Sequence, residues 1–214
     1  MKRCPYCFKP LPENGTCDCR YEYSKNAQIK EALRPGAVVA GCYRIGAVLG
    51  QGGFGITYRA WDLNSKRIVA IKEFFPKGIV VRYGQVNPNA AGESRSNAVV
   101  PVNTEGNNNY KKSLDLFYRE AQALGKLEKQ PNVVHAYHVF RDNDTAYIVM
   151  EYLEGRSLKS IINERGRIPE EELLPLLEPV LKALDKVHSE GILHRDIAPD
   201  NIMVTSDGPV LVDL

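Results

Sequence analysis

The stretch LGQGGFGITYRAWD, residues 49–62, decides the fold, because it places a glycine-rich turn between two strand-like runs. The runs are rich in Val, Ile, Tyr and Phe, and they read YRIGAVLG (43–50), GITYRAWD (55–62) and RIVAIKEFF (67–75). Gly50, Gly52 and Gly55 have the spacing G-x-G-x-x-G, which lets a backbone approach a phosphate closely. Plain hairpins also use such glycines, and the dinucleotide-binding version opens a helix, whereas a strand-like run follows here. The sequence therefore predicts an antiparallel meander with a candidate phosphate loop.

Lys72 ends the apolar stretch VAIK on the third of these runs. An ammonium group there is costly to bury unless an anion meets it, and the alternative is a lysine that extends to solvent. The segment SLDLFYREAQALGKL (113–127) predicts a helix, with apolar residues at helical spacing: Leu114, Phe117, Ala121, Leu124 and Leu127. Glu120 is close to the apolar face of this helix, so it either pairs with Lys72 or lies in solvent.

The other segments predict an α+β chain of two lobes. Residues 77–112 are rich in Asn and Gly and read as an insertion with one hairpin around IVVRYGQV (79–86). VVHAYHVF (133–140) and TAYIVMEYL (145–153) read as two further strands, and residues 157–165 and 170–189 as helices. Pro175 and Pro179 should kink the first half of the second helix or delay its start.

A second polar constellation, HRDIAPDN, occupies residues 194–201. Asp196 and Asn201 lie five apart on a loop, because Pro199 interrupts any helix, and a hairpin should follow Met203. Asp213 comes twelve residues after Asn201, at the end of the apolar run 210–212. An acid, an amide and a second acid in this pattern suit a catalytic loop, and the alternative is a polar turn.

Taken in order along the chain, these motifs resemble those of the protein kinase family, and in style those of bacterial serine/threonine kinases. GQGGFG matches the glycine-rich loop, VAIK the strand-three lysine, REAQAL the helix-C glutamate, HRDIAPDN the catalytic loop, and residues 212–214 the start of the Asp-Phe-Gly motif. The resemblance runs from Tyr43 to the last residue. It implies a protein-kinase-like bilobal fold, with a five-stranded antiparallel N-lobe carrying helix C and a truncated, mainly helical C-lobe.

The resemblance also implies roles for the matched residues. Lys72, held by Glu120, would bind the α- and β-phosphates of ATP, and Asp196 would accept the hydroxyl proton of the protein substrate. Asn201 and Asp213 would carry Mg²⁺. Nucleotide-binding positions would be Leu49, Gly50, Gln51, Gly52, Gly53, Phe54, Gly55, Thr57, Ala70, Lys72, Met150, Glu151, Leu153 and Met203.

The implied activity is transfer of the γ-phosphoryl group of ATP to Ser/Thr hydroxyls of proteins. Ala198 departs from the family pattern, because serine/threonine kinases usually carry a lysine there, and Thr57 replaces a common valine. Leu214 replaces phenylalanine and ends the sequence, so we expect a fragment that binds ATP weakly and phosphorylates inefficiently. The alternatives are a nucleotide-binding pseudokinase or scaffold that acts through its N-terminal module and insertion, and a small-molecule kinase, which the HRD form and hinge disfavour.

Four of the five cysteines, Cys4, Cys7, Cys17 and Cys19, lie in the first 19 residues. Two close pairs of thiolates suit tetrahedral Zn²⁺, although the second pair is separated by one residue rather than two. Free or redox-active thiols are the alternative, and the odd cysteine count disfavours a disulfide framework. The segment resembles the small zinc ribbons that precede some bacterial kinases, which implies docking or stability rather than catalysis. Cys42 reads as a small, partly buried residue.

Composition and charge bear on possible partners and on the location of the protein. The chain has 28 Lys+Arg and 26 Asp+Glu, a net charge of +2 that does not favour nucleic acid or a membrane surface. It has no apolar run of about 18 residues and no secretory signal at its N-terminus, so we expect a cytoplasmic protein without a membrane segment. We expect a zinc-ribbon-like module (1–20), a linker (21–40), the N-lobe (41–152, insertion 77–112) and a partial C-lobe (153–214).

Overall fold

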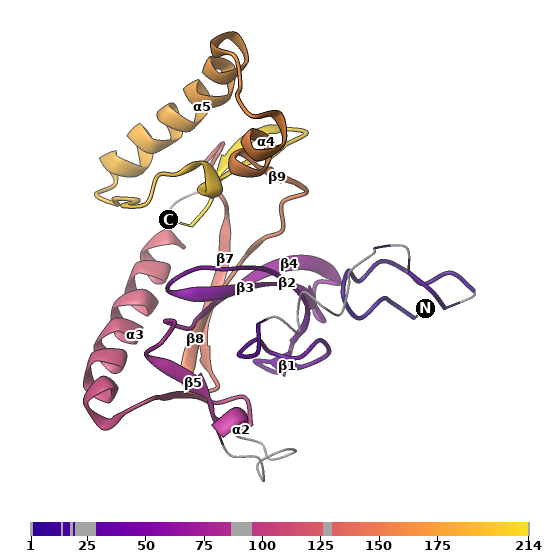
Figure 1. Cartoon of the computed structure of the whole chain (residues 1–214), viewed down its shortest axis with the longest axis vertical. Coiled ribbons are helices and arrows are strands. Elements are labelled where there is room, and N and C mark those ends of the chain that lie inside the picture. The colour runs from indigo at the N-terminus through magenta and orange to yellow at the C-terminus, as the bar shows by residue number, and fades with distance from the viewer. Residues whose placement is uncertain are drawn as a thin grey trace. The chain divides into compact units, whose positions relative to one another are not determined.

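The computed structural model of the chain describes residues 2–13, 15–17, 19, 29–86, 96–125 and 130–213. Leu127 and Leu214, singled out above, lie outside these residues, as do residues 21–28 of the predicted linker and residues 87–95 of the predicted insertion. The chain divides into two compact units (Figure 1). Unit 1 combines Met1–Gln122 with Tyr137–Tyr152, and unit 2 combines Ala123–Ala136 with Leu153–Leu214.

Unit 1 is built on a six-stranded sheet. Its strands, in spatial order, are β1 (Val38–Val39), β2 (Tyr43–Gln51), β3 (Gly55–Asp62), β4 (Arg67–Phe74), β8 (Thr145–Glu151) and β7 (Ala136–Asp142). The five predicted strand-like runs all form strands, and β1 adds a short sixth strand beside β2. Residues on one face of the central strands, including Tyr58, Ile71 and Val149, are almost completely buried and form the main core of the unit.

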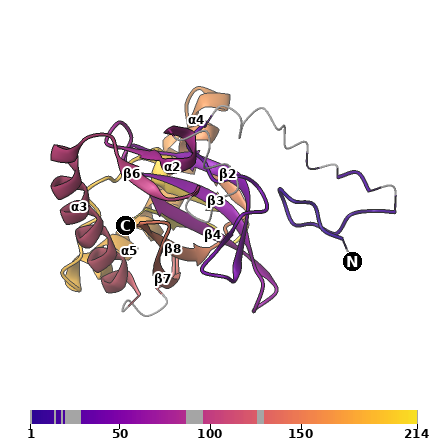
Figure 2. The same cartoon turned by 90° about the horizontal axis from the view of Figure 1, so that it is seen from below.

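Helix α3 (Thr104–Leu124) packs on the sheet through aromatic contacts. Phe74 of β4 lies 4.9 Å from Phe117 and 5.8 Å from Tyr110, measured between ring centroids. The helix begins earlier than the predicted residue 113, because Tyr110 is buried in this contact and stabilises the asparagine-rich first turns. Figures 1 and 2 both show α3 along one side of the sheet, opposite the cysteine-bearing N-terminal segment.

The insertion forms a small sheet of its own. β5 (Val80–Arg82) pairs with β6 (Val99–Pro101), and α2 (Tyr83–Val86) follows β5. The predicted hairpin around residues 79–86 is therefore wrong, because β5 finds its partner beyond residue 95. The described end of the predicted linker also packs against the sheet: Leu33 is 1% exposed, and its amide donates to the hydroxyl of Tyr58.

Unit 2 consists of helices packed on a three-stranded sheet. The sheet contains β9 (Gly155–Ser157), β10 (Ile202–Thr205) and β11 (Gly208–Leu211), and the helical elements are α4 (Leu158–Arg165), α5 (Glu170–Ser189) and the 3₁₀ turn η2 (Pro199–Asn201). Leu158, Val180, Leu184, Ile202 and Leu211 form its core. α5 has the predicted bounds and contains both Pro175 and Pro179, so neither proline delays its start. Among the described residues, no helix has the length and apolar character needed to cross a membrane.

Candidate active site

Asp196 and Asn201 are held together at the tip of the 194–201 loop. The side-chain amide of Asn201 donates to the backbone carbonyl of Asp196 at 2.9 Å and to its Oδ2 at 3.0 Å. Pro199 starts the single turn η2, which a proline favours at its first position, and the backbone amide of Asn201 donates to Ala198. The loop therefore presents an exposed carboxylate whose orientation is set by a neighbouring amide.

His194 anchors this loop to the interior of unit 2. Its side chain is 5% exposed, its Nε2 lies 2.9 Å from the carbonyl oxygen of Val212, and its Nδ1 accepts from the backbone amide of Asp196 at 3.3 Å. A neutral imidazole protonated at Nε2 satisfies both contacts. Arg195 has a φ of 61°, so the chain turns sharply between the buried histidine and the exposed aspartate.

Asp213 is brought to the same loop by the strand that precedes it. β11 is fixed on its outer side by residues 132–134, where Leu211 donates to Asn132 and accepts from Val134. Val212 then donates its amide to the carbonyl of Asn201 at 2.9 Å. The chain reaches Asp213 one residue later, with a φ of 62°. Unit 2 thus brings together the three polar residues that the sequence singled out in it, and Met203 lies on the neighbouring strand β10.

In unit 1, the predicted nucleotide-binding residues of the central strands share one face of the sheet. Lys72 lies opposite Thr57 of β3 and Ile148 of β8, and Ala70 lies opposite Met150. Because side chains alternate along a strand, all five point away from the core face that carries Tyr58 and Ile71. Glu151, next to Met150, pairs with Val69 at the end of β8. Leu153, also predicted to bind the nucleotide, belongs to unit 2.

The glycines of the 50–55 loop fall into two groups. A Cβ on Gly55 would overlap the carbonyl oxygen of Glu73, so close packing on β4 requires glycine there. Gly50, Gly52 and Gly53 have open space where a Cβ would lie, and their φ values are not positive. Neither packing nor backbone conformation within the described chain explains glycine at these three positions.

The loop itself rests on the end of β4. Backbone amides of Phe75 and Lys77 donate to the carbonyls of Phe54 and Gly53, both at 2.9 Å. The side chain of Phe54 is 75% exposed at the tip of the loop, and Leu49 before it is 44% exposed. Gln51, the last residue of β2, pairs with Ile56. The predicted phosphate loop is therefore an exposed hairpin turn with a defined backbone.

Helix α3 lies on the Lys72 side of the sheet. Lys72 and Phe74 are two residues apart on β4 and share a face, and Phe74 contacts Phe117 of α3. Glu120 follows Phe117 by three residues, which places it near the same face of the helix, and its side chain is exposed. This placement is compatible with the predicted Lys72–Glu120 pair, which stays a prediction.

The four N-terminal cysteines converge. Their Sγ atoms all lie within 4.8 Å of one another, with 3.8 Å from Cys4 to Cys19 and 3.5 Å from Cys7 to Cys17. Burial opposes ionisation of Cys4, but hydrogen bonds from the amides of Cys7 and Tyr6 lower its pKa to about 7. Burial and the neighbouring thiols raise the pKa of Cys7 to about 12. A cation is needed for all four to become thiolates together.

Sequence reasoning missed a buried charge directly after Lys72. Glu73 is 0% exposed and accepts hydrogen bonds from Tyr58 (2.7 Å), Tyr147 (2.9 Å) and Arg82 (2.8 Å). Arg82 belongs to β5 and also donates to the carbonyls of Glu31 and Asn97. The sequence did contain a signal for this buried charge: an acidic residue follows Lys72 directly, so it points to the opposite face of an otherwise apolar strand. The cluster ties the insertion and the segment before β1 to the sheet.

The sequence of this chain is similar to those of known protein kinases. The protein kinase domain model matches residues 82–213. A probable serine/threonine-protein kinase of Clostridium perfringens is 33% identical over 181 residues, which are 83% of this chain and 22% of that protein. Serine/threonine-protein kinase PrkC of Bacillus subtilis is 32% identical over 177 residues, which are 83% of this chain and 23% of PrkC. The chain thus spans less than a quarter of the length of these two curated relatives.

Solved structures agree with the fold. The apo form of PpkA-294 is 30% identical, with a TM-score of 0.74 over 86% of this chain and 62% of that one. The PknI kinase domain of Mycobacterium tuberculosis, at 23% identity and a TM-score of 0.61, covers 85% of this chain and 62% of that one and shares the fold. The sequence motifs, the sheet with its flanking helix and these matches agree. This chain belongs to the protein kinase family, with bacterial serine/threonine kinases among its relatives.

Proposed function

We propose that the protein transfers the γ-phosphoryl group of ATP to Ser or Thr hydroxyls of a protein substrate. The observation that carries the proposal is the pairing of Asn201 with Asp196 in unit 2, with the chain reaching Asp213 one residue after the Val212–Asn201 hydrogen bond. Asp196 is exposed and oriented, as a group that accepts a hydroxyl proton must be. In the transfer, the hydroxyl oxygen forms the new P–O bond, the bond to the β-phosphate oxygen breaks, and ADP leaves.

The glycine-rich hairpin supports binding of a triphosphate. Gly50, Gly52 and Gly53 leave open space at the turn, and this space lets backbone amides approach phosphate oxygens. Lys72, on the same face as Ala70 and Met150, would place an ammonium group near those phosphates. The nucleotide is proposed to be ATP because the family uses it, and the Rad53 structure among the similar ones was solved with AMP-PNP.

Asn201 and Asp213 fit a magnesium ion by their chemistry. Asn201 uses its amide nitrogen toward Asp196, so its Oδ1 is the atom left for a cation, and the Asp213 carboxylate supplies a second hard oxygen. Mg²⁺, when bound, neutralises charge that develops on the phosphoryl oxygens. The residues of the chain orient the substrate hydroxyl and hold its proton at the Asp196 carboxylate.

The Cys4, Cys7, Cys17 and Cys19 set is proposed to hold structural Zn²⁺. Tetrahedral coordination with Zn–S bonds of about 2.3 Å spaces sulfurs by about 3.8 Å, and the two measured separations are 3.5 and 3.8 Å. The donor set, four sulfurs at one point, suits zinc better than the oxygen-seeking cations. Free or redox-active thiols would be indicated if purified protein held no zinc and its four thiols reacted freely.

A nucleotide-binding protein without transfer activity is the second candidate, and Ala198 favours it. The residue caps η2 with its backbone, and its methyl side chain offers no charge to a γ-phosphate. Losing one preorganised donor costs about 2.7–4 kcal/mol of transition-state stabilisation. The two candidates agree on ATP binding and differ in turnover.

Two measurements test the proposal. Calorimetric titration with AMP-PNP and Mg²⁺ should show binding that the Lys72→Met variant loses and that Lys111→Met, an exposed lysine of α3, retains. Transfer from labelled ATP to a generic protein substrate is then measured on the longest natural protein that contains these residues. Binding without transfer would establish the second candidate, and absence of binding would refute both.

A further inference from the structure

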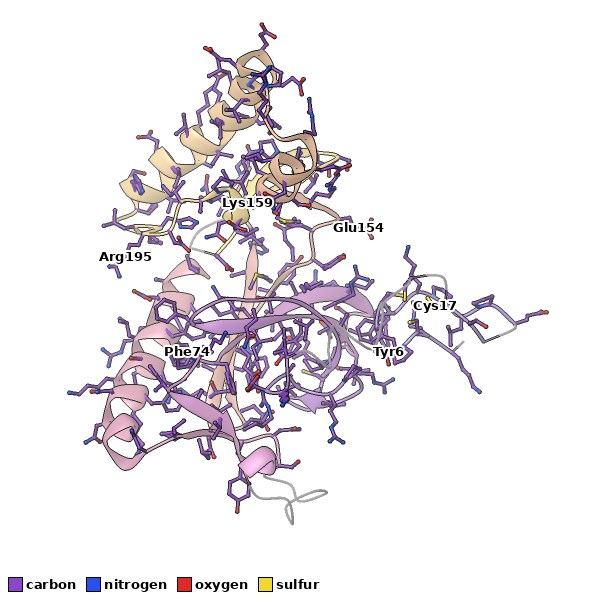
Figure 3. The ribbon with its side chains drawn as sticks, in the orientation of Figure 1. Tyr6, Cys17, Phe74, Glu154, Lys159 and Arg195 are labelled. Carbon is purple, nitrogen blue, oxygen red and sulfur yellow. The ribbon has the colours of Figure 1, made fainter. Side chains whose placement is uncertain are left out.

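The N-terminal cysteine module, defined here as the described residues up to Cys19, is seated on strand β2. The backbone amide of Ala47 in β2 donates to the carbonyl oxygen of Tyr6 at 3.1 Å. Gly46 explains why the approach is so close: a Cβ there would lie 2.6 Å from that carbonyl and 2.6 Å from Cε2 of Phe8. Figure 3 labels Tyr6 at the side of the module next to the sheet, and Cys17 among the sulfurs.

The seat is at an irregular point of the sheet. β2 pairs with β3 at Ile45 and again at Val48, but the register shifts between these residues and once more between Val48 and Gly50. Such bulges free backbone amides from the ladder, and a buried amide needs a partner. Ala47 is 1% exposed, and the carbonyl of Tyr6 supplies that partner. The module therefore completes the strand that leads into the glycine-rich turn.

Side chains of the module also pack on β3, the strand beside this part of β2. Phe8 is 2% exposed and lies 6.1 Å from the ring of Trp61, measured between centroids, on the neighbouring strand β3. The guanidinium of Arg3 lies over the same indole at 4.1 Å and donates to the carbonyl of Phe8 at 2.7 Å. The contact thus spans both strands of the hairpin that carries the glycine-rich turn.

Metal binding and docking use the same short turn. Tyr6 and Phe8, which touch β2, stand on either side of Cys7, one of the four converging thiols. Phe8 has a φ of 61°, and its amide donates to Cys4, so the turn between the first two cysteines sets the position of both groups. A module this short has too small a core to hold that turn without its metal.

We propose that the module is a zinc-dependent clamp on β2 that holds the glycine-rich hairpin in its nucleotide-binding form. Without zinc, Tyr6 and Phe8 leave β2, the amide of Ala47 loses its partner, and the hairpin opens more often. Apparent nucleotide affinity falls with the population of the competent hairpin. The nucleotide step of this inference rests on the function proposed above, whereas the docking step does not.

The test compares metal removal with a variant that blocks docking and leaves every cysteine in place. Gly46→Ala puts a methyl group where Tyr6 and Phe8 now lie, and Phe8→Ala removes the docked ring without altering β2. Lys9→Ala, an exposed residue of the module, is the control. For each protein we would measure bound zinc, exchange of the Ala47 amide by NMR, and the Kd of AMP-PNP with Mg²⁺ in excess.

Removing zinc with a selective chelator should speed Ala47 exchange about tenfold or more, because local opening then governs that amide. It should also raise the Kd about three- to tenfold. The Gly46→Ala and Phe8→Ala variants should do the same while retaining zinc, and Lys9→Ala should change nothing.

Unchanged Ala47 exchange after zinc removal would overturn the clamp. Faster exchange with an unchanged Kd would show that docking does not reach the nucleotide, which also overturns the proposal. If wild-type protein failed to bind AMP-PNP, the proposed function and the nucleotide step would fall together, and Ala47 exchange would still decide the docking step.

Discussion

Glu73 in unit 1 and Asp196 in unit 2 are both carboxylates beside kinase motifs, yet their surroundings are opposite. Glu73 is 0% exposed and accepts from two tyrosines and Arg82. Asp196 is exposed, and the side-chain amide of Asn201 orients it. A buried charge must have permanent partners within the chain, so its lone pairs are committed to structure. An oriented carboxylate at the surface keeps lone pairs for a substrate.

The buried charge of Glu73 also shifts the pKa values of its partners. Burial, and then the charge of Glu73, raise the pKa values of Tyr58 and Tyr147 well above their ordinary range, so both stay protonated and donate. Glu73 likewise raises the pKa of Arg82 against the effect of its burial. The three donors of the cluster therefore keep their protons. Burial and saturation of hydrogen bonds therefore separate the structural carboxylate Glu73 from Asp196, the carboxylate proposed to act in chemistry, although both adjoin a motif.

Breaking the buried cluster should give the largest effect on stability. Arg82→Met would leave Glu73 charged without its cation, and removing one partner of a buried pair costs about 3–5 kcal/mol. Urea unfolding of the variant and the parent measures the difference. The matched control is Arg141→Met, which removes an ion pair whose side chains are 50% and 54% exposed and should cost at most about 1 kcal/mol. Equal losses for the two variants would contradict the comparison.

The exposed carboxylate should show the reverse pattern. Asp196→Asn removes the proposed proton acceptor and should lower the transfer rate about 10²-fold or more. The free energy of unfolding and the Kd of AMP-PNP should stay close to those of the parent, because the side chain is exposed. Asp207→Asn, in the exposed turn between β10 and β11, is the control and should leave the rate unchanged. A strongly destabilised Asp196→Asn protein would place this residue with Glu73 instead.

His194 is buried like Glu73, and it also supports the loop that carries Asp196. Its removal should therefore lower both the stability and the transfer rate, each to an intermediate extent. His194→Leu would leave the carbonyl of Val212 and the amide of Asp196 without their partner, at a cost of about 1–3 kcal/mol. Because the ring positions the loop, the transfer rate should fall as well while Mg²⁺-dependent AMP-PNP binding weakens less. His188→Leu on the exposed side of α5 serves as the control. A stable variant with an unchanged rate would remove His194 from the positioning role.

Elements with a strong local pattern were predicted well from the sequence. The five strand-like runs and the bounds of the 170–189 helix follow from periodicity and β-branched content alone. The start of α3 was missed because residues 104–112 are poor helix formers, and the stacking of Tyr110 on Phe74 outweighs that propensity. The pairing of β5 was missed because its partner is distant in the chain.

The same distinction holds for the site. Asp196, Asn201 and Asp213 could be singled out as candidates because their spacing along the chain is short and follows a motif. The Glu73–Arg82 pair and the seat of Phe8 on Gly46 depend on contacts between separate segments, which no local pattern contains. Gly46 lies within a predicted strand, and the position that its Cβ would take shows why a larger residue does not fit there.

Asp62, the last residue of β3, is a carboxylate intermediate between Glu73 and Asp196. Its replacement should have the smallest effect of those predicted here. It is 8% exposed and accepts from three neutral donors: the amides of Asn64 and Ser65 and the hydroxyl of Ser65. The positive charge of Arg67 acts on it as well, more weakly than these hydrogen bonds. Burial opposes its ionisation, yet these hydrogen bonds lower its pKa below the ordinary 3.8. Folding thus favours the ionised form, so its stabilisation is present above pH 3.8 and is lost as the pH falls through the folded-state pKa.

The variant Asp62→Asn keeps the shape of the side chain and removes the charge. Near neutral pH it should be less stable than the parent by about 1 kcal/mol, the usual worth of such hydrogen bonds. The gap should narrow once the pH falls below 3.8, where the parent loses the same charge. Urea unfolding of both proteins near neutral pH and in acid measures it. A stability difference that stayed constant with pH would mean that the shape of the turn, and not the charge of Asp62, stabilises the fold. The charge would then be important in the Glu73 cluster but not at Asp62.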